Sequence, residues 1–436
     1  MTLKALQILS AEVEPKLLDL PWHIPLRDWP EDFITALPRG ISRHVVRFVN
    51  LNDQVIAVKE IGETVAHHEY ETLRSLNRIN APCVEPLAVI SNRFSETGDP
   101  LNSVLITRHL GYSLPYRAIF GQGTIRQETI NRLVDALTVL MVRLHLLGFY
   151  WGDVSLSNTL FRRDAEEFSA YLVDAETGEL HEQLSAKKRE YDIEVARTNI
   201  IGELFDLQAG GILNQDYDAI EIGNRFSDRY FKLWDELTSK ESFAMTERWR
   251  VENRVRRLNE LGFEIGELNM ETDSSGSRLS IQPKVVDAGH YSRKLMRLIG
   301  LDVEEAQARR MINDMEQFRT LTKQKDVPLE IVAHQWMAQV YQPTIQAIPR
   351  EMFAKLEPAQ IFHEILDHRW FIAEHADHDI LMSEATASYI ENVLKNRPDE
   401  KAMFTREEIE DADFTEDEFL PTDSDDDLDD WSGYLA

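Results

Sequence analysis

The sequence WGDVSLSNTLF, residues 151–161, decides the fold prediction for this chain of 436 residues. It places Asp153 ahead of Asn158 in an Asp-x4-Asn loop, between a predicted long helix and a predicted strand. A second stretch, YLVDAET at 171–177, ends a short apolar strand with Asp174. A carboxylate can accept the proton of an attacking hydroxyl, and amide and carboxylate oxygens suit Mg2+. The two stretches therefore predict a phosphoryl-transfer centre in which Asp153 orients the acceptor and Asn158 and Asp174 hold the metal.

Two further charged residues precede these stretches in the order that phosphoryl transfer requires. Lys59 lies in VIAVKE, residues 55–60, a predicted strand that would hold the ammonium toward nucleotide phosphates. Glu69 follows on a predicted helix and can fix Lys59 through an ion pair. Taken alone, Lys59 is typical of an edge-strand charge, and an Asp-x4-Asn pair is typical of a capped turn. The order and spacing of all these residues together favour the catalytic interpretation.

This arrangement resembles the protein-kinase superfamily, and more narrowly the bacterial lipopolysaccharide (Kdo) kinases, which show a Gly-Asp-x4-Asn loop. The resemblance covers roughly residues 38–207. It implies ATP and Mg2+ as cofactors, and the hydroxyl of an unknown sugar, lipid-sugar or protein as acceptor. The roles that it implies are a phosphate-binding lysine at Lys59, its helix partner at Glu69, a catalytic carboxylate at Asp153, and metal ligands at Asn158 and Asp174.

Some positions depart from the family pattern. The glycine-rich loop is reduced to Gly40 in LPRGISRHVV, residues 37–46, so Gly40 is the backbone contact that we expect for the cofactor phosphates. Trp151-Gly152 replaces His-Arg before the catalytic aspartate, and Asp174-Ala175-Glu176 replaces Asp-Phe-Gly. No charge needed for the chemistry is lost. The departures leave open a second class of function, an ATP-binding pseudokinase that serves as a scaffold.

Hydrophobic periodicity along the chain predicts an α+β protein. We expect a bilobal protein-kinase-like fold followed by a mainly helical domain that contains a β-hairpin. Asp192, at the start of a helix, resembles the buried aspartate that braces the catalytic loop in such folds. The segment at 285–318 resembles an uncharacterised C-terminal domain attached to bacterial kinase-like proteins. The predicted bounds are 1–36 for an N-terminal extension, 37–110 for the N-lobe, 111–258 for the helical C-lobe, 259–397 for the C-terminal domain and 398–436 for an acidic disordered tail.

Two other clusters have alternative interpretations. His290, Arg293, Lys294 and Arg297 gather at a predicted strand-to-helix junction, which suits either an anion site or a solvated helix face. The segment IFHEILDHRWFIAEHADHD, residues 361–379, is rich in histidine and carboxylate, which suggests a metal. Its His-Glu-x3-His spacing differs from that of the zinc helix, so a helix interior or interface with satisfied histidines is favoured.

Charge and composition limit the classes of partner. The formal net charge is −29, and residues 399–436 carry 16 acidic against two basic residues, a net of −14. The remaining body is moderately acidic, so no nucleic-acid partner is expected. The aromatic residues of the tail, among them Phe404 and Trp431, leave open a protein partner or a simple solvating end.

One cysteine and one apolar segment bear on the compartment. Cys83 is the only cysteine, which excludes an intrachain disulfide and indicates a reducing compartment, so we expect a cytoplasmic protein. The most apolar segment, at 133–151, contains Asp135, Arg143 and His145 at helical intervals. It therefore predicts a buried amphipathic helix, and no transmembrane segment is expected.

Overall fold

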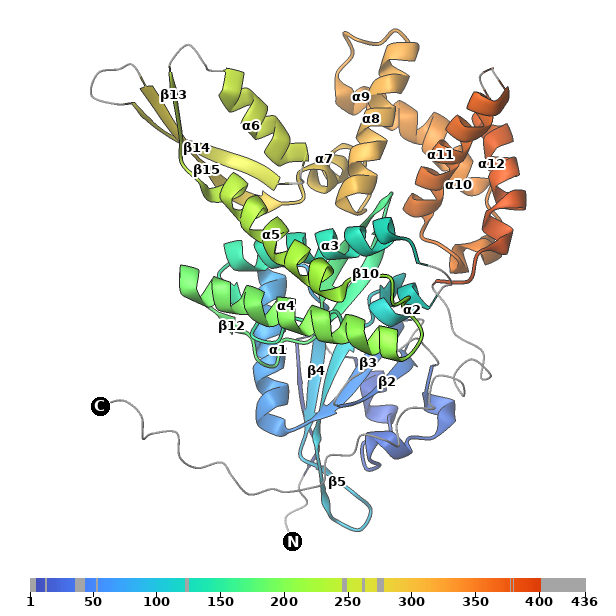
Figure 1. Ribbon diagram of the computed structural model, residues 1–436. Helices are drawn as coiled ribbons and strands as arrows, with labels where there is room; N and C mark the ends of the chain where they lie inside the picture. The colour runs from blue at the N-terminus through green and yellow to red at the C-terminus, as the bar shows by residue number, and fades with distance from the viewer. Residues whose placement is uncertain are drawn as a thin grey trace.

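The computed structural model describes residues 5–11, 14–35, 44–51, 54–121, 125–244, 249–260, 263–272, 278–376, 378 and 380–400. Gly40, the turn at 273–277 and the acidic tail beyond Glu400 lie outside these residues, so the predictions for them are not addressed by the fold. The described residues form a sheet lobe, a helical lobe and a further helical region (Figure 1). This architecture confirms the predicted α+β class, with two lobes followed by helices.

A five-stranded antiparallel sheet forms the first lobe, in the order β1-β4-β7-β3-β2. The β2–β3 hairpin confirms the sequence prediction and pairs Leu51 with Gln54 at its end. Short strands β5 (Arg93–Phe94) and β6 (Pro100–Leu101) lie between β4 and β7 and pair with each other. The five main strands are β1 (Gln7–Ser10), β2 (Val45–Leu51), β3 (Gln54–Ile61), β4 (Pro86–Ser91) and β7 (Ser103–Arg108).

Alternation along β3 decides which face of the sheet carries Lys59. Ile56 and Val58 are buried in the core on one face, together with residues from the N-terminal stretch. Ile61 is buried in the core on the other face, which helix α1 (Glu63–Arg78) covers. Successive side chains of a strand point to opposite faces of the sheet. Lys59 therefore points with Ile61, toward α1 and the second lobe.

The N-terminal stretch is held on the sheet by a buried arginine. Arg93 is 1% exposed, and its guanidinium donates to the carbonyls of Trp22 and Ile24. The same guanidinium pairs with Glu60 at 2.6 Å. A buried charge is stable only when it is paired and hydrogen-bonded, so Arg93 fixes the path of the stretch. The stretch contains three short 3-10 turns, at Pro15–Asp19, Leu26–Asp28 and Glu31–Phe33.

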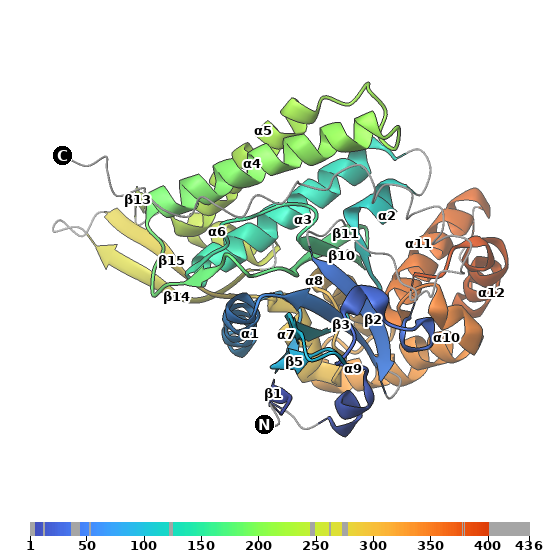
Figure 2. The same ribbon diagram turned by 90° about the horizontal axis from the view of Figure 1, so that it is seen from below.

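Three long helices build the second lobe: α3 (Gln127–Leu146), α4 (Ala186–Ala209) and α5 (Ala219–Thr238). They run side by side, with α4 and α5 on the outer side of α3 (Figure 2). The predicted long helix is α3, and Gly148, with a φ of +84°, follows its end as the sequence suggests. Shorter elements complete the lobe: β8 (Ser113–Pro115), α2 (Tyr116–Phe120), β9 (Phe149–Tyr150), β10 (Thr159–Asp164), β11 (Glu167–Leu172) and β12 (Glu179–Leu180).

A small antiparallel sheet follows α5, in the order β13-β15-β14. The sequence predicts the β14–β15 pair but misses β13, because four residues without a clear alternation give too weak a signal. The elements of this part are β13 (Glu241–Ala244), α6 (Trp249–Glu260), β14 (Phe263–Thr272) and β15 (Arg278–Ala288). None of the helices in the described ranges has both the length and the apolar composition that crossing a membrane requires.

The C-terminal helices enclose two cores, one around Trp336 and Phe362 and the other around Ile365 and Tyr389. A π turn at Met337–Tyr341 joins two of these helices ahead of Pro343, whose missing N–H breaks the regular helical hydrogen bonding. Short 3-10 turns lie at Arg350–Ala354 and Leu394–Asn396. The helices are α7 (His290–Ile299), α8 (Glu305–Leu321), α9 (Leu329–Trp336), α10 (Gln342–Gln346), α11 (Pro358–Ala376) and α12 (Met382–Asn392).

The β10–β11 hairpin is the platform on which this helical region docks (Figure 1). Asp164, 4% exposed, accepts the backbone N–H groups of Ala306 at 3.0 Å and Gln307 at 2.8 Å in the first turn of α8. The carboxylate thereby caps N–H groups that have no partner within the helix. Gln360 of α11 exchanges two hydrogen bonds with the backbone of Ala165.

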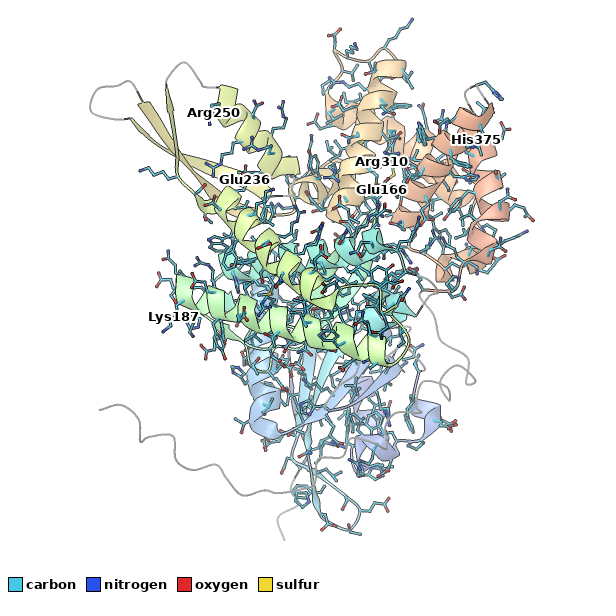
Figure 3. All side chains as sticks on the ribbon, in the orientation of Figure 1. Glu166, Lys187, Glu236, Arg250, Arg310 and His375 are labelled. Atoms are coloured by element: carbon cyan, nitrogen blue, oxygen red, sulfur yellow. The ribbon has the colours of Figure 1, made fainter. Side chains whose placement is uncertain are left out.

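Charged side chains of the hairpin reinforce this docking. Arg162 pairs with Glu304 at 2.9 Å and with Glu357 at 2.7 Å. Tyr171 donates its hydroxyl to Glu304 at 2.6 Å. Glu166, at the end of the hairpin, faces the helical region near Arg310 of α8 (Figure 3). The helical region is thus attached to the two strands that lead from Asn158 and toward Asp174.

We expect Asp164→Ala to weaken this docking, because the N–H of Ala306 would lose its acceptor in a buried place and the N–H of Gln307 would keep only the Glu304 side chain. A buried donor left without a partner costs roughly 1–3 kcal/mol. Hydrogen exchange measured by mass spectrometry should become faster in the first turn of α8 and in the hairpin. The control is Glu71→Ala, an exposed carboxylate of α1 outside this interface, which should leave exchange unchanged. Equal exchange in wild type and Asp164→Ala would contradict this role.

Candidate active site

The ammonium of Lys59 is the centre of a group of carboxylates from two segments, helix α1 and the loop after β11. Its Nζ lies 3.0 Å from Glu69 of α1 and 2.8 Å from Asp174, which follows β11. Glu176 is a third neighbour at 3.5 Å. The structure therefore brings together Lys59, Glu69 and Asp174, which the sequence analysis selected from spacing alone.

Burial and charge act in opposite directions on the pKa values of this group. Burial alone would lower the pKa of Lys59, but Glu69 and Asp174 outweigh it, and the pKa is raised. Burial raises the pKa of Glu69 to about 7, the charge of Asp174 acts in the same direction, and Lys59 opposes both. Lys59 is therefore charged across the neutral range, whereas Glu69 titrates within it.

The loop at 151–158 is held in a fixed shape by its own side chains. Asn158 donates its amide to the carbonyl of Asp153 at 2.9 Å and to the Asp153 carboxylate at 3.3 Å. Gly152 has a φ of +82°, and a Cβ there would lie 3.2 Å from the ring of Tyr150 and 3.3 Å from the Thr177 carbonyl. Only glycine adopts this conformation without strain, which explains the glycine ahead of Asp153.

Asp192 braces the start of this loop, as the resemblance implied. The residue is 0% exposed and accepts the N–H groups of Trp151 at 2.8 Å and Gly152 at 2.9 Å. His145 lies 3.1 Å from the same carboxylate through Nε2, and its Nδ1 lies 2.6 Å from the Tyr230 hydroxyl. Burial lowers the pKa of His145, so the neutral ring donates to Asp192 and accepts from Tyr230.

Glu203, one of the residues that the sequence analysis missed, braces the end of the same loop. Its carboxylate accepts the N–H groups of Leu156 and Ser157, each at 2.8 Å, and the Ser157 hydroxyl at 2.5 Å. Asp192 and Glu203 lie on the same face of α4 because eleven residues make nearly three helical turns. That spacing is the sequence signal that could have identified Glu203.

Trp151 and Glu176, two of the departures from the family pattern, both take part in the site. The Trp151 indole donates to the Asp174 carbonyl at 2.8 Å, which ties the loop of Asp153 to the loop of Asp174. Glu176 pairs with His44 at 3.1 Å, so it contacts the start of β2 as well as Lys59. The hydrogen bond to Asp174 gives a structural reason for tryptophan at position 151. Glu176 adds a third carboxylate to the group around Lys59.

The side chains present fit a nucleotide with a divalent cation. The oxygens of Glu69, Asp174 and Glu176 lie within 4.8 Å of one another, and carboxylates are hard ligands of the kind that Mg2+ takes. Asn158 directs its amide nitrogen to Asp153, which leaves its amide oxygen as the end that could bind a metal. The Lys59 ammonium is the kind of group that binds phosphates.

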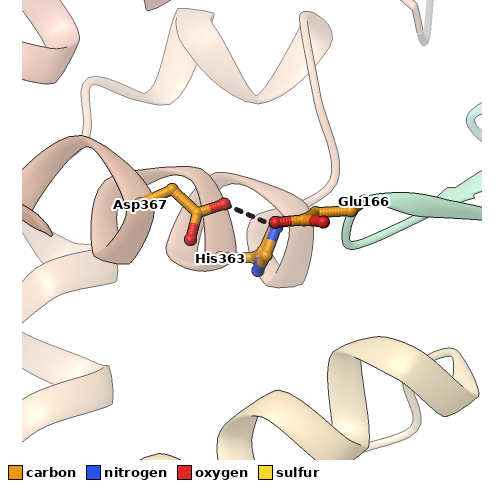
Figure 4. Close-up of side chains that lie close together, drawn as sticks. All are labelled: Glu166, His363 and Asp367. Atoms are coloured by element: carbon orange, nitrogen blue, oxygen red, sulfur yellow. Dashed lines mark ion pairs between the residues drawn. The ribbon is translucent and has the colours of Figure 1, made fainter. Parts of the chain in front are cut away.

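The two clusters outside this site have internal partners. The Glu305 carboxylate accepts the N–H groups of Tyr291 at 2.8 Å and Ser292 at 3.0 Å, so the first turn of α7 already holds an anionic group. His363 pairs with Asp367 at 3.0 Å, with the Glu166 carboxylate close by (Figure 4). These three side chains could hold a metal ion, and Nδ1 of His363 is buried without a hydrogen-bond partner, so the metal and the interface interpretations both stay predictions.

The family models that match this chain are those of a kinase family and of an uncharacterised domain. Residues 48–202 match the family described as the lipopolysaccharide kinase (Kdo/WaaP) family. Residues 232–394 match a domain of unknown function, DUF4032. These two matches confirm the resemblance that the motifs suggested, including the uncharacterised C-terminal domain.

One solved structure is described as WaaP in complex with acyl carrier protein. It aligns with 58% of this chain and 99% of its own chain, at 15% sequence identity and a TM-score of 0.35. No curated protein matches the sequence.

The raised pKa of Glu69 predicts a pH-dependent stability. The pKa of Glu69 in the folded state lies near 7, above the ordinary value of 4.5. The uncharged carboxyl of Glu69 therefore contributes fully to the stability of the fold below about pH 4.5, and this contribution is lost as the pH rises through 7. Glu69→Gln cannot ionise, so the melting temperature of wild type relative to this variant should fall between pH 5 and pH 8. Glu71→Gln, exposed on the same helix, is the control and should give a constant difference. A constant difference for Glu69→Gln as well would refute the assignment.

Proposed function

We propose that this protein is an ATP- and Mg2+-dependent phosphotransferase that moves the γ-phosphate to a hydroxyl of a sugar, lipid-sugar or protein. The observation that carries the proposal is the contact of one buried lysine with Glu69 and Asp174, beside the braced loop of Asp153. Phosphoryl transfer depends mainly on positioned charges, and these are the charges that it requires. The family match at 48–202 supports the same class.

Each residue would have a separate task. Lys59, oriented by Glu69, would bind nucleotide phosphates, and Gly40 would contribute a backbone contact to them. Asn158 and Asp174 would hold Mg2+, which when bound neutralises charge on the phosphate oxygens. Asp153 would accept the proton of the acceptor hydroxyl and direct its oxygen toward the phosphate.

Asp153→Ala should abolish phosphate transfer and leave nucleotide binding intact, because the carboxylate acts on the acceptor and not on the nucleotide. Calorimetry with ATP and Mg2+ would measure binding, and release of ADP with a panel of hydroxyl acceptors would measure turnover. Asp206→Ala, exposed on α4, is the control and should retain both. Unchanged transfer by Asp153→Ala would overturn the proposal.

Asp174→Ala should instead remove the dependence of nucleotide binding on Mg2+, because the variant lacks a metal ligand. Titrating ATP at increasing Mg2+ concentration would show a strong dependence in wild type and a weak one in the variant. Replacing one carboxylate that binds both a metal and Lys59 should also reduce turnover by roughly a hundredfold or more. A wild-type Mg2+ response in Asp174→Ala would mean that other residues hold the metal.

A second candidate function is an ATP-binding scaffold that binds a protein partner through the C-terminal domain or the acidic tail. The observation that favours it is the contact of Glu176 with both Lys59 and His44, which places an extra negative charge where phosphates would bind. Binding of ATP and Mg2+ without transfer to any sugar, lipid or protein acceptor would support the scaffold.

A further inference from the structure

One face of α4 runs along the whole catalytic loop. Asp192, Asn199 and Glu203 are spaced by seven and four residues, so they lie on one side of the helix. Asp192 binds the start of the loop and Glu203 binds its end. Asn199, between them, lies opposite the middle of the loop, where Asp153 is placed.

The amide of Asn199 contacts this middle part in two places. Its Nδ2 donates to the Val154 carbonyl at 3.0 Å and lies 3.5 Å from Oδ1 of Asp153. Both neighbours are acceptors, so the –NH2 end of the amide must face them. The longer of the two distances does not exclude a role in catalysis, because such contacts often tighten only when substrate is bound.

The other carboxylate oxygen of Asp153 faces a second amide. Oδ2 lies 3.3 Å from Nδ2 of Asn158, so the amide groups of Asn199 and Asn158 each face a different oxygen of the Asp153 carboxylate. Two donors on different oxygens fix the rotation of a carboxylate better than one donor does. Both donors are neutral, so they orient the Asp153 carboxylate without forming an ion pair with it. An ion pair would stabilise the charged form of the carboxylate and reduce its ability to accept a proton.

We propose that Asn199 is a positioning residue that fixes the orientation of the Asp153 carboxylate toward the acceptor hydroxyl. This inference rests on the proposed phosphotransferase function. Asp192 and Glu203 bind the two ends of the loop, whereas Asn199 binds its middle, at the Val154 carbonyl and beside the Asp153 carboxylate. In the part of the chain that the structure describes, Asn199 bonds to these two residues and not to Lys59, Glu69 or Asp174, so its role is confined to the proton-accepting step.

The test compares Asn199→Ala and Asn199→Asp with wild type, using the full chain. Misplacing a reacting group by about 1 Å costs on the order of a hundredfold in rate, so kcat should fall by about 10- to 100-fold. KM for ATP and the calorimetric Kd for ATP with Mg2+ should stay within about twofold of wild type. Thr198→Ala, the neighbouring exposed residue on the same helix, is the control and should keep wild-type kcat and KM.

A crystal structure of Asn199→Ala provides a readout that does not depend on turnover. We expect the Asp153 carboxylate to leave its present rotamer while the backbone of the loop stays in place on Asp192 and Glu203. An unchanged rotamer, or a kcat equal to wild type after correction for the folded fraction, would overturn the positioning role. A displaced carboxylate together with a wild type that transfers no phosphate would support the positioning role and refute the proposed function instead. The aspartate side chain in Asn199→Asp has nearly the shape of asparagine but lacks the N–H donor. This variant can therefore be measured in place of Asn199→Ala if the alanine variant is unstable.

Discussion

The buried carboxylate of Asp192 is the interaction on which the geometry of the site depends. A carboxylate with no exposed surface is stable only where hydrogen-bond donors surround it. Here the donors are His145 and the backbone N–H groups of Trp151 and Gly152. Those two N–H groups belong to the loop that carries Asp153. Satisfying the buried charge therefore also fixes the loop, and the stability of the lobe and the placement of the Asp153 carboxylate depend on the same hydrogen bonds.

Spacing along the sequence was sufficient for some residues of the site and not for others. Lys59 and Glu69 could be predicted because their order and spacing ahead of the Asp153 loop and Asp174 match what phosphoryl transfer requires, and the structure joins them. Glu203 has only its spacing from Asp192 as a sequence signal. Asn199 could not be predicted, because the role of a polar residue on a helix depends on the path of the loop beside it. The sheet partner of β1 and the packing of residues 15–34 were missed for the same reason, since such contacts join distant parts of the chain. The bounds of the domains, and the roles assigned to the site residues, stay predictions.

The β10–β11 hairpin connects the two halves of the molecule. Its first strand follows Asn158 and its second leads to Asp174, so both proposed metal ligands lie at its base. Its other end is held by α8 and α11 through Asp164, Arg162 and the backbone of Ala165. The C-terminal helices are therefore attached to the same two strands that connect to the proposed metal ligands.

The buried guanidinium of Arg93 has a consequence for how the protein can be divided. A fragment that started at residue 37, where a kinase-like lobe is expected to begin by its motifs, would lack the carbonyls of Trp22 and Ile24. It would expose one face of the sheet, with Val58 and Ile90, to water. Such a fragment should aggregate when expressed, even though it would contain all the proposed site residues. A soluble fragment of this protein should therefore include residues 15–34, which precede the first of the proposed site residues.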